Sequence, residues 1–220
     1  MSFETLQLGT GIYTVSDLAE ILKIEKSRAR YWFNEYVRNI LPTITNHVYN
    51  FNQTQGLFVN FKSLLQLYVF EELKKKGIKK KDILNAYRTL SKMYSTPYPF
   101  ATNKVLTAGK DILIELDHNS LINANQSMQY NLVEVLIPYL DKIEFDISGN
   151  AIKFFPFGAD NCVVVDPEVQ FGSPTINGTR IDIKTIFEMF EAGDSKKFIA
   201  KIYNLSLKQV NDAIEFSNAA

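Results

Sequence analysis

The side chains best suited to chemistry in this sequence are a group of hydrogen-bond donors near the N-terminus: Lys26, Ser27, Arg28 and Arg30. Ammonium, guanidinium and hydroxyl groups donate to phosphate oxygens and base edges, which suits this group to nucleic acid. Apolar residues recur among and beyond them at helical spacing: Ala29, Trp32, Phe33 and Tyr36. The spacing predicts an amphipathic helix whose polar face contacts duplex DNA. The alternative is a helical hairpin with a solvated basic face.

A second helix is expected directly before this one. Its apolar side is formed by residues at helical spacing: Val15, Leu18, Ala19 and Leu22. Thr14 can cap its N-terminus, and Asp17 follows three residues later as the partner in a capping box. Two short helices that meet at a tight turn predict a helix-turn-helix. Wing-like and helical segments follow in the order expected of a DNA-binding domain.

The remaining polar residues form no catalytic or metal-binding pattern. Cys162 is the single cysteine and cannot form an internal disulfide, and His47 and His118 lack the spacing of zinc ligands. Several acidic residues in the last third are those expected at turns and helix caps: Asp166, Glu168, Asp182, Glu191 and Asp194. The sequence therefore argues against an enzyme, and we expect no cofactor and no metal.

The composition is typical of folded, soluble protein, because 46% of the 220 residues are apolar and 22% are charged. The length favours two or three small domains. No apolar run is long enough to span a membrane, and the N-terminus lacks a basic segment followed by an apolar core. We therefore expect a cytoplasmic protein with no membrane contact.

The net charge of zero conceals two halves of opposite sign. Residues 1–98 contain 14 Lys and Arg against 8 Asp and Glu, which is a net charge of +6. Residues 99–220 contain 10 against 16, which is a net charge of −6. The basic half suits a polyanion such as DNA, and the acidic half suits a basic protein partner.

A β-hairpin in the position of a wing is expected after the two helices. Alternating apolar residues predict arms at residues 46–51 and 57–61 around a turn at 53–56. Gln53 and Gln55 would lie at its polar tip, where they could contact a DNA groove. An ordinary surface hairpin is the alternative for these tip residues.

Two amphipathic helices are then expected, at residues 61–76 and 78–93, with Gly77 after the end of the first. Lysines gather between them: Lys74, Lys75, Lys76, Lys79, Lys80 and Lys81. Such clusters are usually solvated helix ends, and we favour that interpretation over contact with phosphates.

This order of elements resembles the winged helix-turn-helix of MerR-type regulators. The resemblance rests on YTVSDLAEILKI, RARYW, a wing ending in FVNF, and GIKKKDIL, and covers about the first ninety residues. It implies that Arg30 contacts DNA and that Tyr31 contacts DNA or supports the contact. The chain departs from the family at Glu25, where a small hydroxyl residue is common, and at Val59, where the wing commonly has arginine.

A small α+β spacer is expected at residues 99–161, after the proline-containing linker at 95–99. We expect a hairpin over residues 104–116 that turns at 108–110, a strand at 120–124 and a helix at 131–140. A second hairpin turns about Ser148-Gly149-Asn150. No chemistry is apparent in this segment.

Residues 162–220 are expected to form a hairpin followed by three short helices. Asn177-Gly178 is a strong turn signal, since both positions tolerate positive φ. The first helix is expected to start at Asp182 or Ile183, the second to be capped by Asp194 or Ser195, and the third to begin at 205–206 with Ser206 as its cap. Nine apolar residues would form their core: Ile186, Phe187, Phe190, Phe198, Ile199, Ile202, Val210, Ile214 and Phe216.

This last segment resembles the family catalogued as domain of unknown function 433, which is associated with VapB-like antitoxins. The resemblance rests on VVVDPEVQFGSPTINGTRIDI, with Ser173 and Asp182 as departures from the usual basic residue and proline. It implies a partner that resembles a PIN-domain ribonuclease toxin. Arg180 in this motif could contact DNA or a partner, or could form an ion pair with an acidic neighbour such as Asp166.

These observations predict a mainly helical α+β protein with a winged helix-turn-helix at 1–98, a spacer at 99–161 and a hairpin plus three-helix, helix-turn-helix-like module at 162–220. We expect an antitoxin that binds operator DNA and neutralises a ribonuclease toxin through its acidic half. A MerR-like transcription regulator without a toxin is the alternative. A homodimer is also expected, because such proteins commonly bind two half-sites. Phe154, Phe155 and Phe157 could form the dimer surface or belong to the core.

Overall fold

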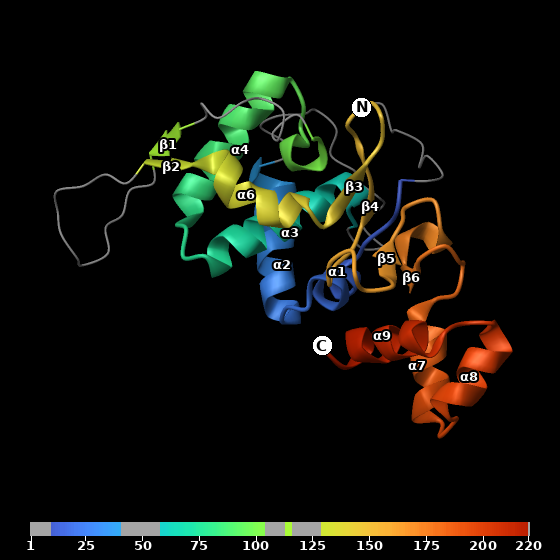
Figure 1. Ribbon diagram of the computed structural model, residues 1–220. Helices are drawn as coiled ribbons and strands as arrows, with labels where there is room; N and C mark the ends of the chain where they lie inside the picture. The colour runs from blue at the N-terminus through green and yellow to red at the C-terminus, as the bar shows by residue number, and fades with distance from the viewer. Residues whose placement is uncertain (1–9, 41–57, 104–112, 116–128, 220) are drawn as a thin grey trace, which may run out of the picture.

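The computed structural model describes residues 10–40, 58–103, 113–115 and 129–219, and the chain is mixed α/β and mainly helical (Figure 1). Its α-helices are α1 (Val15–Leu22), α2 (Lys26–Asn34), α3 (Phe61–Lys75), α4 (Lys80–Tyr94), α6 (Leu132–Leu140), α7 (Ile183–Glu191), α8 (Lys196–Tyr203) and α9 (Leu207–Asn218). Its strands are β1 (Leu113–Glu115), β2 (Gln129–Asn131), β3 (Ile143–Phe145), β4 (Ala151–Phe154), β5 (Val163–Val165) and β6 (Pro174–Ile176). Short 3-10 and π segments are η1 (Glu35–Ile40), η3 (Pro99–Ala101) and η4 (Gln170–Gly172). None of the helices in these ranges is long and apolar enough to cross a membrane.

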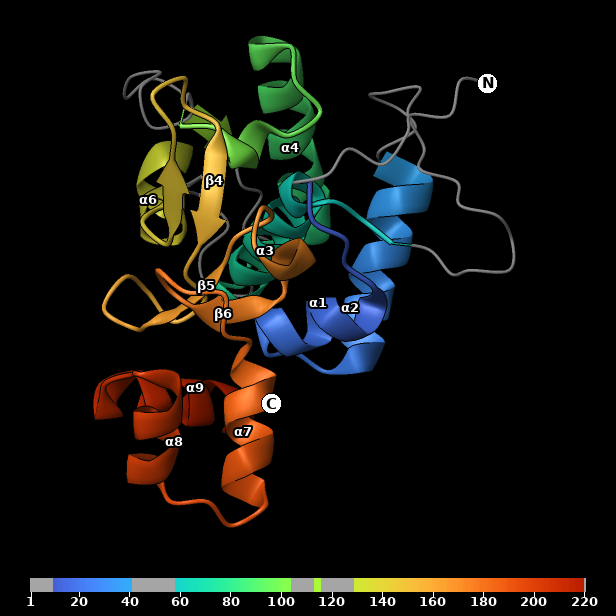
Figure 2. The same ribbon diagram turned by 90° about the vertical axis from the view of Figure 1, so that its right-hand side faces the viewer.

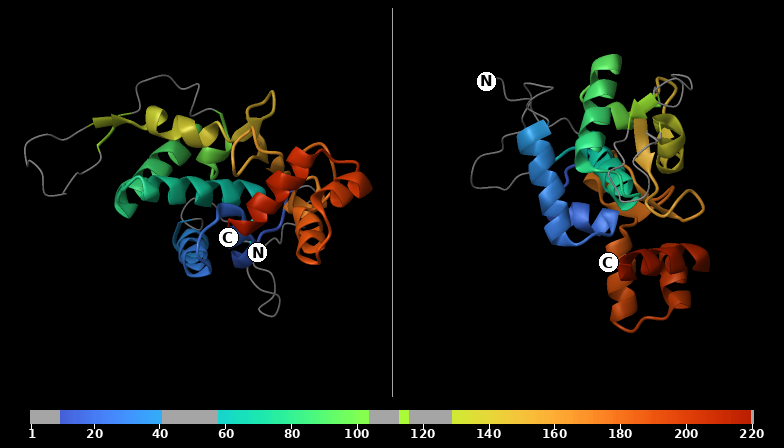
Figure 3. Two further views of the ribbon diagram at one scale, coloured as in Figure 1. Left: turned by 60° about the horizontal axis from the view of Figure 1, so that its bottom comes forward. Right: turned by 90° about the vertical axis from the view of Figure 1, so that its left-hand side faces the viewer.

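Helix α3 is the centre of the N-terminal part. It is buried on nearly every face, and its buried residues include the polar Ser63, Gln66 and Glu71. Asn60 caps its first turn by accepting a hydrogen bond from the Ser63 amide at 2.9 Å. The α1–α2 pair lies on one side of α3 and α6 lies on the other (Figures 1 and 3). A helix enclosed in this way must satisfy its polar side chains inside the protein.

Aromatic rings connect the three layers. The ring of Trp32 in α2 lies 5.7 Å from that of Phe70 in α3, measured between centroids. On the opposite side of α3, Tyr68 lies 6.3 Å from Tyr139 of α6. Tilted and edge-on pairs of this kind each contribute about 0.5–1.5 kcal/mol beyond the burial of their surface. They fix the orientation of α2 relative to α3.

The packing of the core continues past residue 98. One cluster of buried apolar residues runs from Tyr13 to Val165. Phe100 is fully buried within it, and its amide donates a hydrogen bond to the Gln66 side chain at 3.1 Å. The domain boundary expected between residues 98 and 99 stays a prediction. In the structure, side chains from both sides of this position pack into one cluster.

A four-stranded antiparallel sheet in the order β3-β4-β5-β6 joins the middle of the chain to its C-terminal part (Figure 2). The predicted hairpin at 148–150 is confirmed as the turn between β3 and β4. Strand β5 was missed by the sequence analysis. It pairs with β4 through Phe154 and Val165 and with β6 through Val163 and Ile176. The sheet therefore spans the boundary expected between residues 161 and 162.

The elements expected between residues 104 and 140 are only partly described. Strand β1 pairs with β2, with Leu113 opposite Asn131, a pairing that the sequence analysis did not predict. The first arm of the predicted hairpin at 104–116 lies outside the described residues. The predicted turn at 108–110 and strand at 120–124 lie outside the described residues. The predicted helix is confirmed as α6, and Pro138 falls in its last turn, where its lack of an N–H removes one hydrogen bond to the carbonyl four residues earlier.

The three C-terminal helices begin at the predicted caps. The side chains of Asp182, Ser195 and Ser206 accept hydrogen bonds from amides in the first turns of α7, α8 and α9. The turn at Asn177-Gly178 also forms, but its second arm is a single bridge between Thr175 and Asp182 rather than a strand. The chain leaves the sheet there because Asp182 already caps α7.

Two residues expected in the core of these helices are instead exposed: Phe198 at 47% and Ile202 at 54%. Ile199 of the same helix is fully buried, so only one narrow face of α8 packs against its neighbours. The aromatic residues of β4 and the residues after it show the reverse. Phe154 and Phe155 are buried and Phe157 packs against Phe216, so these rings belong to the core.

Candidate nucleic-acid interface

The turn between α1 and α2 is short and well defined. Thr14 and Asp17 form the predicted capping box at the start of α1. Lys23 ends α1 in the left-handed conformation with φ of 52°, and the amide of Ile24 donates to the carbonyl of Ala19 at 3.1 Å. Helix α2 follows at Lys26, and Glu25 before it makes no side-chain capping hydrogen bond. The departure at Glu25 noted in the sequence thus leaves the first amides of α2 without a side-chain acceptor.

Helix α2 divides into a buried face and an exposed face, as the spacing predicted. Its buried apolar residues are Ala29, Trp32 and Phe33, and Tyr36 continues the same face into η1. Its exposed residues include all five candidate contacts: Lys26, Ser27, Arg28, Arg30 and Tyr31. This division brings the donor side chains together on one accessible surface.

A buried carboxylate that the sequence analysis missed supports this face from behind. Glu71 of α3 is 2% exposed and accepts hydrogen bonds from the Trp32 indole nitrogen and from Arg28 Nε, both at 2.7 Å. Two charge-assisted donors stabilise the carboxylate and hold both side chains in one orientation. Arg28 therefore has a structural role, and 43% of its side chain remains exposed. A glutamate within the leucine-rich run of α3 was the available sequence signal.

Two lysines of the cluster, Lys74 in the last turn of α3 and Lys80 at the start of α4, lie beside α2. A hollow of about 500 Å³ is lined by Glu25, Ser27, Arg28, Tyr31, Trp32, Lys74 and Lys80. Lys80 Nζ lies 2.8 Å from the Glu35 carboxylate and 5.4 Å from the Tyr31 ring centroid. The hydrogen bond to Glu35 raises the pKa of Lys80. At least two members of the lysine cluster thus extend the surface of α2.

The other candidate residues are placed less completely. Gln53 and Gln55 lie outside the described residues, and of the expected wing only residues 58–61 are described, of which Phe61 already begins α3. The backbone of Val59 pairs with that of Tyr13 through two hydrogen bonds of 2.9 Å. Arg180 is exposed, and no carboxylate of the described residues lies within 4 Å of its guanidinium. The ion pair with Asp166 that the sequence suggested is therefore not formed.

The C-terminal module packs directly on this helix pair. The amide of Ile12 donates to the carbonyl of Phe171 at 3.1 Å, and any side chain in place of Gly172 would collide with the Tyr13 hydroxyl. Lys23 Nζ lies 3.7 Å from the centroid of the Phe216 ring, and burial lowers the pKa of this lysine to about 8. The C-terminal module therefore helps to fix the position of α1, in addition to the contacts within the N-terminal part.

Comparisons with known proteins agree with this architecture. Residues 163–217 match the model of a protein family of unknown function, DUF433. The chain is 24% identical to the uncharacterized protein Rv2308 of Mycobacterium tuberculosis (strain ATCC 25618 / H37Rv), in an alignment that covers 97% of this chain and 92% of that protein. It is 22% identical to a protein of the same strain named "Putative antitoxin VapB45", in an alignment that covers 96% of this chain and 95% of that protein.

A solved structure of another protein has a similar fold. The crystal structure of Rv2018 from Mycobacterium tuberculosis superposes with a TM-score of 0.65 at 17% identity, covering 97% of this chain and 99% of that one. The C-terminal resemblance expected from the sequence is thus confirmed by the family match. The resemblance of the N-terminal part to MerR-type regulators stays a prediction.

Proposed function

We propose that this chain is an antitoxin that binds operator DNA through the exposed face of α2 and neutralises a ribonuclease toxin. The observation that carries the DNA part is the geometry of that face. Donor side chains are exposed on one side of α2, and its other side is held by the buried Glu71 and by aromatic packing. The backbone of α2 and the Arg28 side chain are thus held before binding, which lowers the cost of ordering these groups in a complex.

In the proposed complex, the N-terminal half of α2 lies in the major groove. Lys26, Ser27 and Arg30 contact base edges or phosphates, and Lys74, which lines the same hollow as Ser27 and Arg28, neutralises a phosphate. Arg28 contributes through the part of its guanidinium that Glu71 does not bind. Tyr31, which is 50% exposed, packs against the DNA backbone or supports Arg30.

The toxin part of the proposal is supported by the similarity to a protein named as an antitoxin, and by the family match. The sequence resemblance supplies the class of partner, a PIN-like ribonuclease. Such an enzyme must attract RNA phosphates, so its active-site surroundings are basic, and the acidic residues of this chain's second half can be steered toward it. In this proposal the chain binds DNA and the toxin as a homodimer and catalyses no reaction itself.

The DNA part is tested by anisotropy of a fluorescent duplex that contains the DNA upstream of the gene. The double variant Lys26→Ala, Arg30→Ala should bind more weakly by roughly 1–3 kcal/mol for each side chain that reaches a base. The matched control is Arg88→Ala, Lys92→Ala, which removes the same charge from exposed positions farther along α4. Equal affinities of the two double variants would refute the assignment of α2.

The toxin part is tested separately by co-expression with the product of the adjacent reading frame. The full chain should co-purify with that product and protect RNA from it. If the adjacent product is no ribonuclease, or is not bound, while DNA binding holds, the chain is a regulator without a toxin.

A further inference from the structure

The structure contains a second turn with the same geometry as the one between α1 and α2. Residues 195–216 repeat the local conformation of residues 14–35, each 181 positions later in the chain. Ser195 caps an eight-residue helix as Thr14 does. Asn204 then adopts φ of 52°, the same value as Lys23. The next amide, that of Leu205, donates to Ala200 at 2.8 Å, as Ile24 donates to Ala19.

The buried positions of the two units correspond as well. Ile199 takes the place of Leu18 in the first helix, and both are at most 1% exposed. In the second helix, Val210 takes the place of Ala29 and Ile214 that of Phe33, and all four are buried. Because the same positions face inward, α9 presents its N-terminal half to solvent in the way that α2 does.

The second unit is the more basic of the two. Residues 195–211 contain four lysines and no carboxylate, although the second half of the chain is acidic. The corresponding residues 14–30 contain four basic and three acidic side chains. Lys197 and Lys201 are exposed on α8, and no carboxylate of the described residues lies within 4 Å of either.

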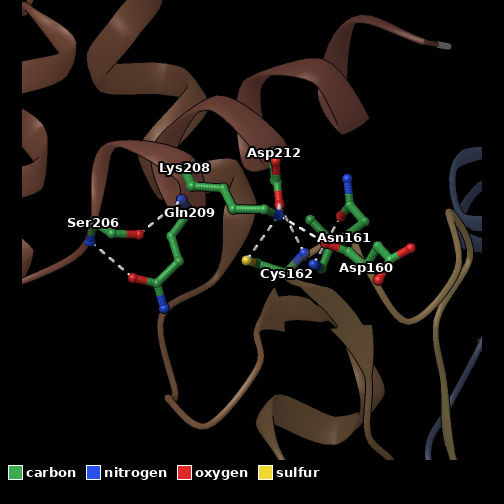
Figure 4. Close-up of polar contacts among 8 residues, drawn as sticks. Asp160, Asn161, Cys162, Ser206, Lys208, Gln209 and Asp212 are labelled. Carbon is green, nitrogen blue, oxygen red and sulfur yellow. Dashed lines mark hydrogen bonds and ion pairs between the residues drawn. The ribbon is translucent and has the colours of Figure 1, made fainter.

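The two remaining lysines, Lys196 and Lys208, form hydrogen bonds within the C-terminal part, and Figure 4 shows those of Lys208. Lys208 Nζ donates to the Asp212 carboxylate at 2.6 Å and to the Asp160 carbonyl at 2.7 Å. Asp212 also accepts from the Cys162 amide at 2.8 Å, which ties α9 to the start of β5. Lys196 Nζ donates to the Asn211 side chain at 2.8 Å and thereby links α8 to α9. The start of α9 is thus held in place, and the available cations are on α8.

We propose that α8 and α9 form a second DNA-contacting unit. Lys197 and Lys201 neutralise phosphates of the duplex, and the start of α9 enters the groove with Leu207, which is 46% exposed, toward the base edges. An exposed leucine can contact a thymine methyl group, whereas it gains nothing from solvent. This unit adds to the proposed function but does not depend on α2, since its contacts lie on different helices.

Salt dependence of DNA affinity in the full chain tests this unit. A duplex of about 35 base pairs, or some three helical turns, is long enough for both units to bind. For Lys197→Gln, Lys201→Gln, the slope of log Kd against log salt concentration should fall by about 2, or about 0.9 for each phosphate that is no longer neutralised. Affinity at low salt should fall roughly tenfold.

The matched control is Lys184→Gln, Lys153→Gln, which removes the same charge from lysines outside α8 and α9 that are already paired with Glu188 and Glu144. It should leave the slope unchanged, and circular dichroism should show both variants folded. If both double variants have the slope of the natural chain, the proposal is overturned.

A further variant separates DNA contact from protein docking, because Phe198 and Ile202 are also exposed on α8. Phe198→Ser, Ile202→Ser should keep the sedimentation coefficient of the natural chain. A change in its association state, together with an unchanged salt slope for the lysine variant, would show a protein-docking surface and overturn the proposal. The variant Lys26→Ala, Arg30→Ala tests only the α2 interface. A failure of that test therefore does not contradict DNA contact by α8 and α9.

Discussion

The α1–α2 and α8–α9 units share their turn but differ in what covers them. Ile21 in the first unit is 2% exposed, because α1 packs on the large cluster around α3. Its counterpart Ile202 is 54% exposed, because the smaller C-terminal cluster does not reach it. In both units, capping residues and one left-handed residue form the turn. The surroundings decide which faces of its helices remain accessible.

The two units also share a buried carboxylate that anchors the second helix. Glu71 lies behind α2 and accepts from Arg28 and Trp32. Asp212 belongs to α9 itself and accepts from Lys208 and from the Cys162 amide. In the first unit the anchor comes from another helix, so the orientation of α2 depends on tertiary packing. In the second unit a contact between residues four apart contributes, so the anchor is partly local.

Trp32→Ala should cause the largest loss of unfolding free energy, because Trp32 is 3% exposed. The second unit has no equivalent ring, since the counterpart Ala213 is already small. Removal of a buried aromatic side chain costs about 3–5 kcal/mol of unfolding free energy, and Glu71 also loses a donor. Urea denaturation measures the loss. Trp32→Phe is the matched control: it keeps a ring, removes the donor and should cost about 1–3 kcal/mol. A loss below 1 kcal/mol for Trp32→Ala would contradict the role given to α2 packing.

Ile21→Ala and Ile202→Ala make the same change at equivalent positions of the two units. The difference between their unfolding free energies measures how much the surroundings of each unit contribute. We expect Ile21→Ala to lower the unfolding free energy by about 2–5 kcal/mol, as for other buried isoleucines. Ile202→Ala should change it by no more than about 0.5 kcal/mol. Similar losses at both positions would mean that something covers Ile202 in solution.

A smaller effect than that of Ile21→Ala is expected from Asp212→Asn, and it should depend on pH. Burial raises the pKa of Asp212, but the hydrogen bonds from Lys208 and the Cys162 amide outweigh it, so the pKa in the folded chain lies below its ordinary value. Stabilisation by this carboxylate is therefore present above the ordinary aspartate pKa, about 3.9, and is lost as pH falls through the lower value of the folded state. Thermal unfolding followed by circular dichroism should show a loss at pH 7 that shrinks toward pH 3. A loss independent of pH would point to shape rather than charge.

Local chemistry was sufficient for much of this protein. The caps at Thr14 and Ser206 and the turn at 148–150 were predicted correctly, and the observed caps Asp182 and Ser195 are each one of two predicted alternatives, because a cap or a turn is formed by residues adjacent in the chain. The two faces of α2 were also predicted correctly, since helical periodicity places residues on faces without reference to the rest of the fold.

Only the tertiary structure decided the partners of those elements. Strand β5 is three valines long, too short for a periodic signal, and exists because β4 and β6 lie on either side of it. Phe198 and Ile202 have the spacing of a buried face, yet no element within the described ranges covers them. Glu71 lies 43 residues from Arg28, so their hydrogen bond depends on how α3 packs against α2. Periodicity shows that a face is apolar or charged, but what lies against that face is set by long-range packing.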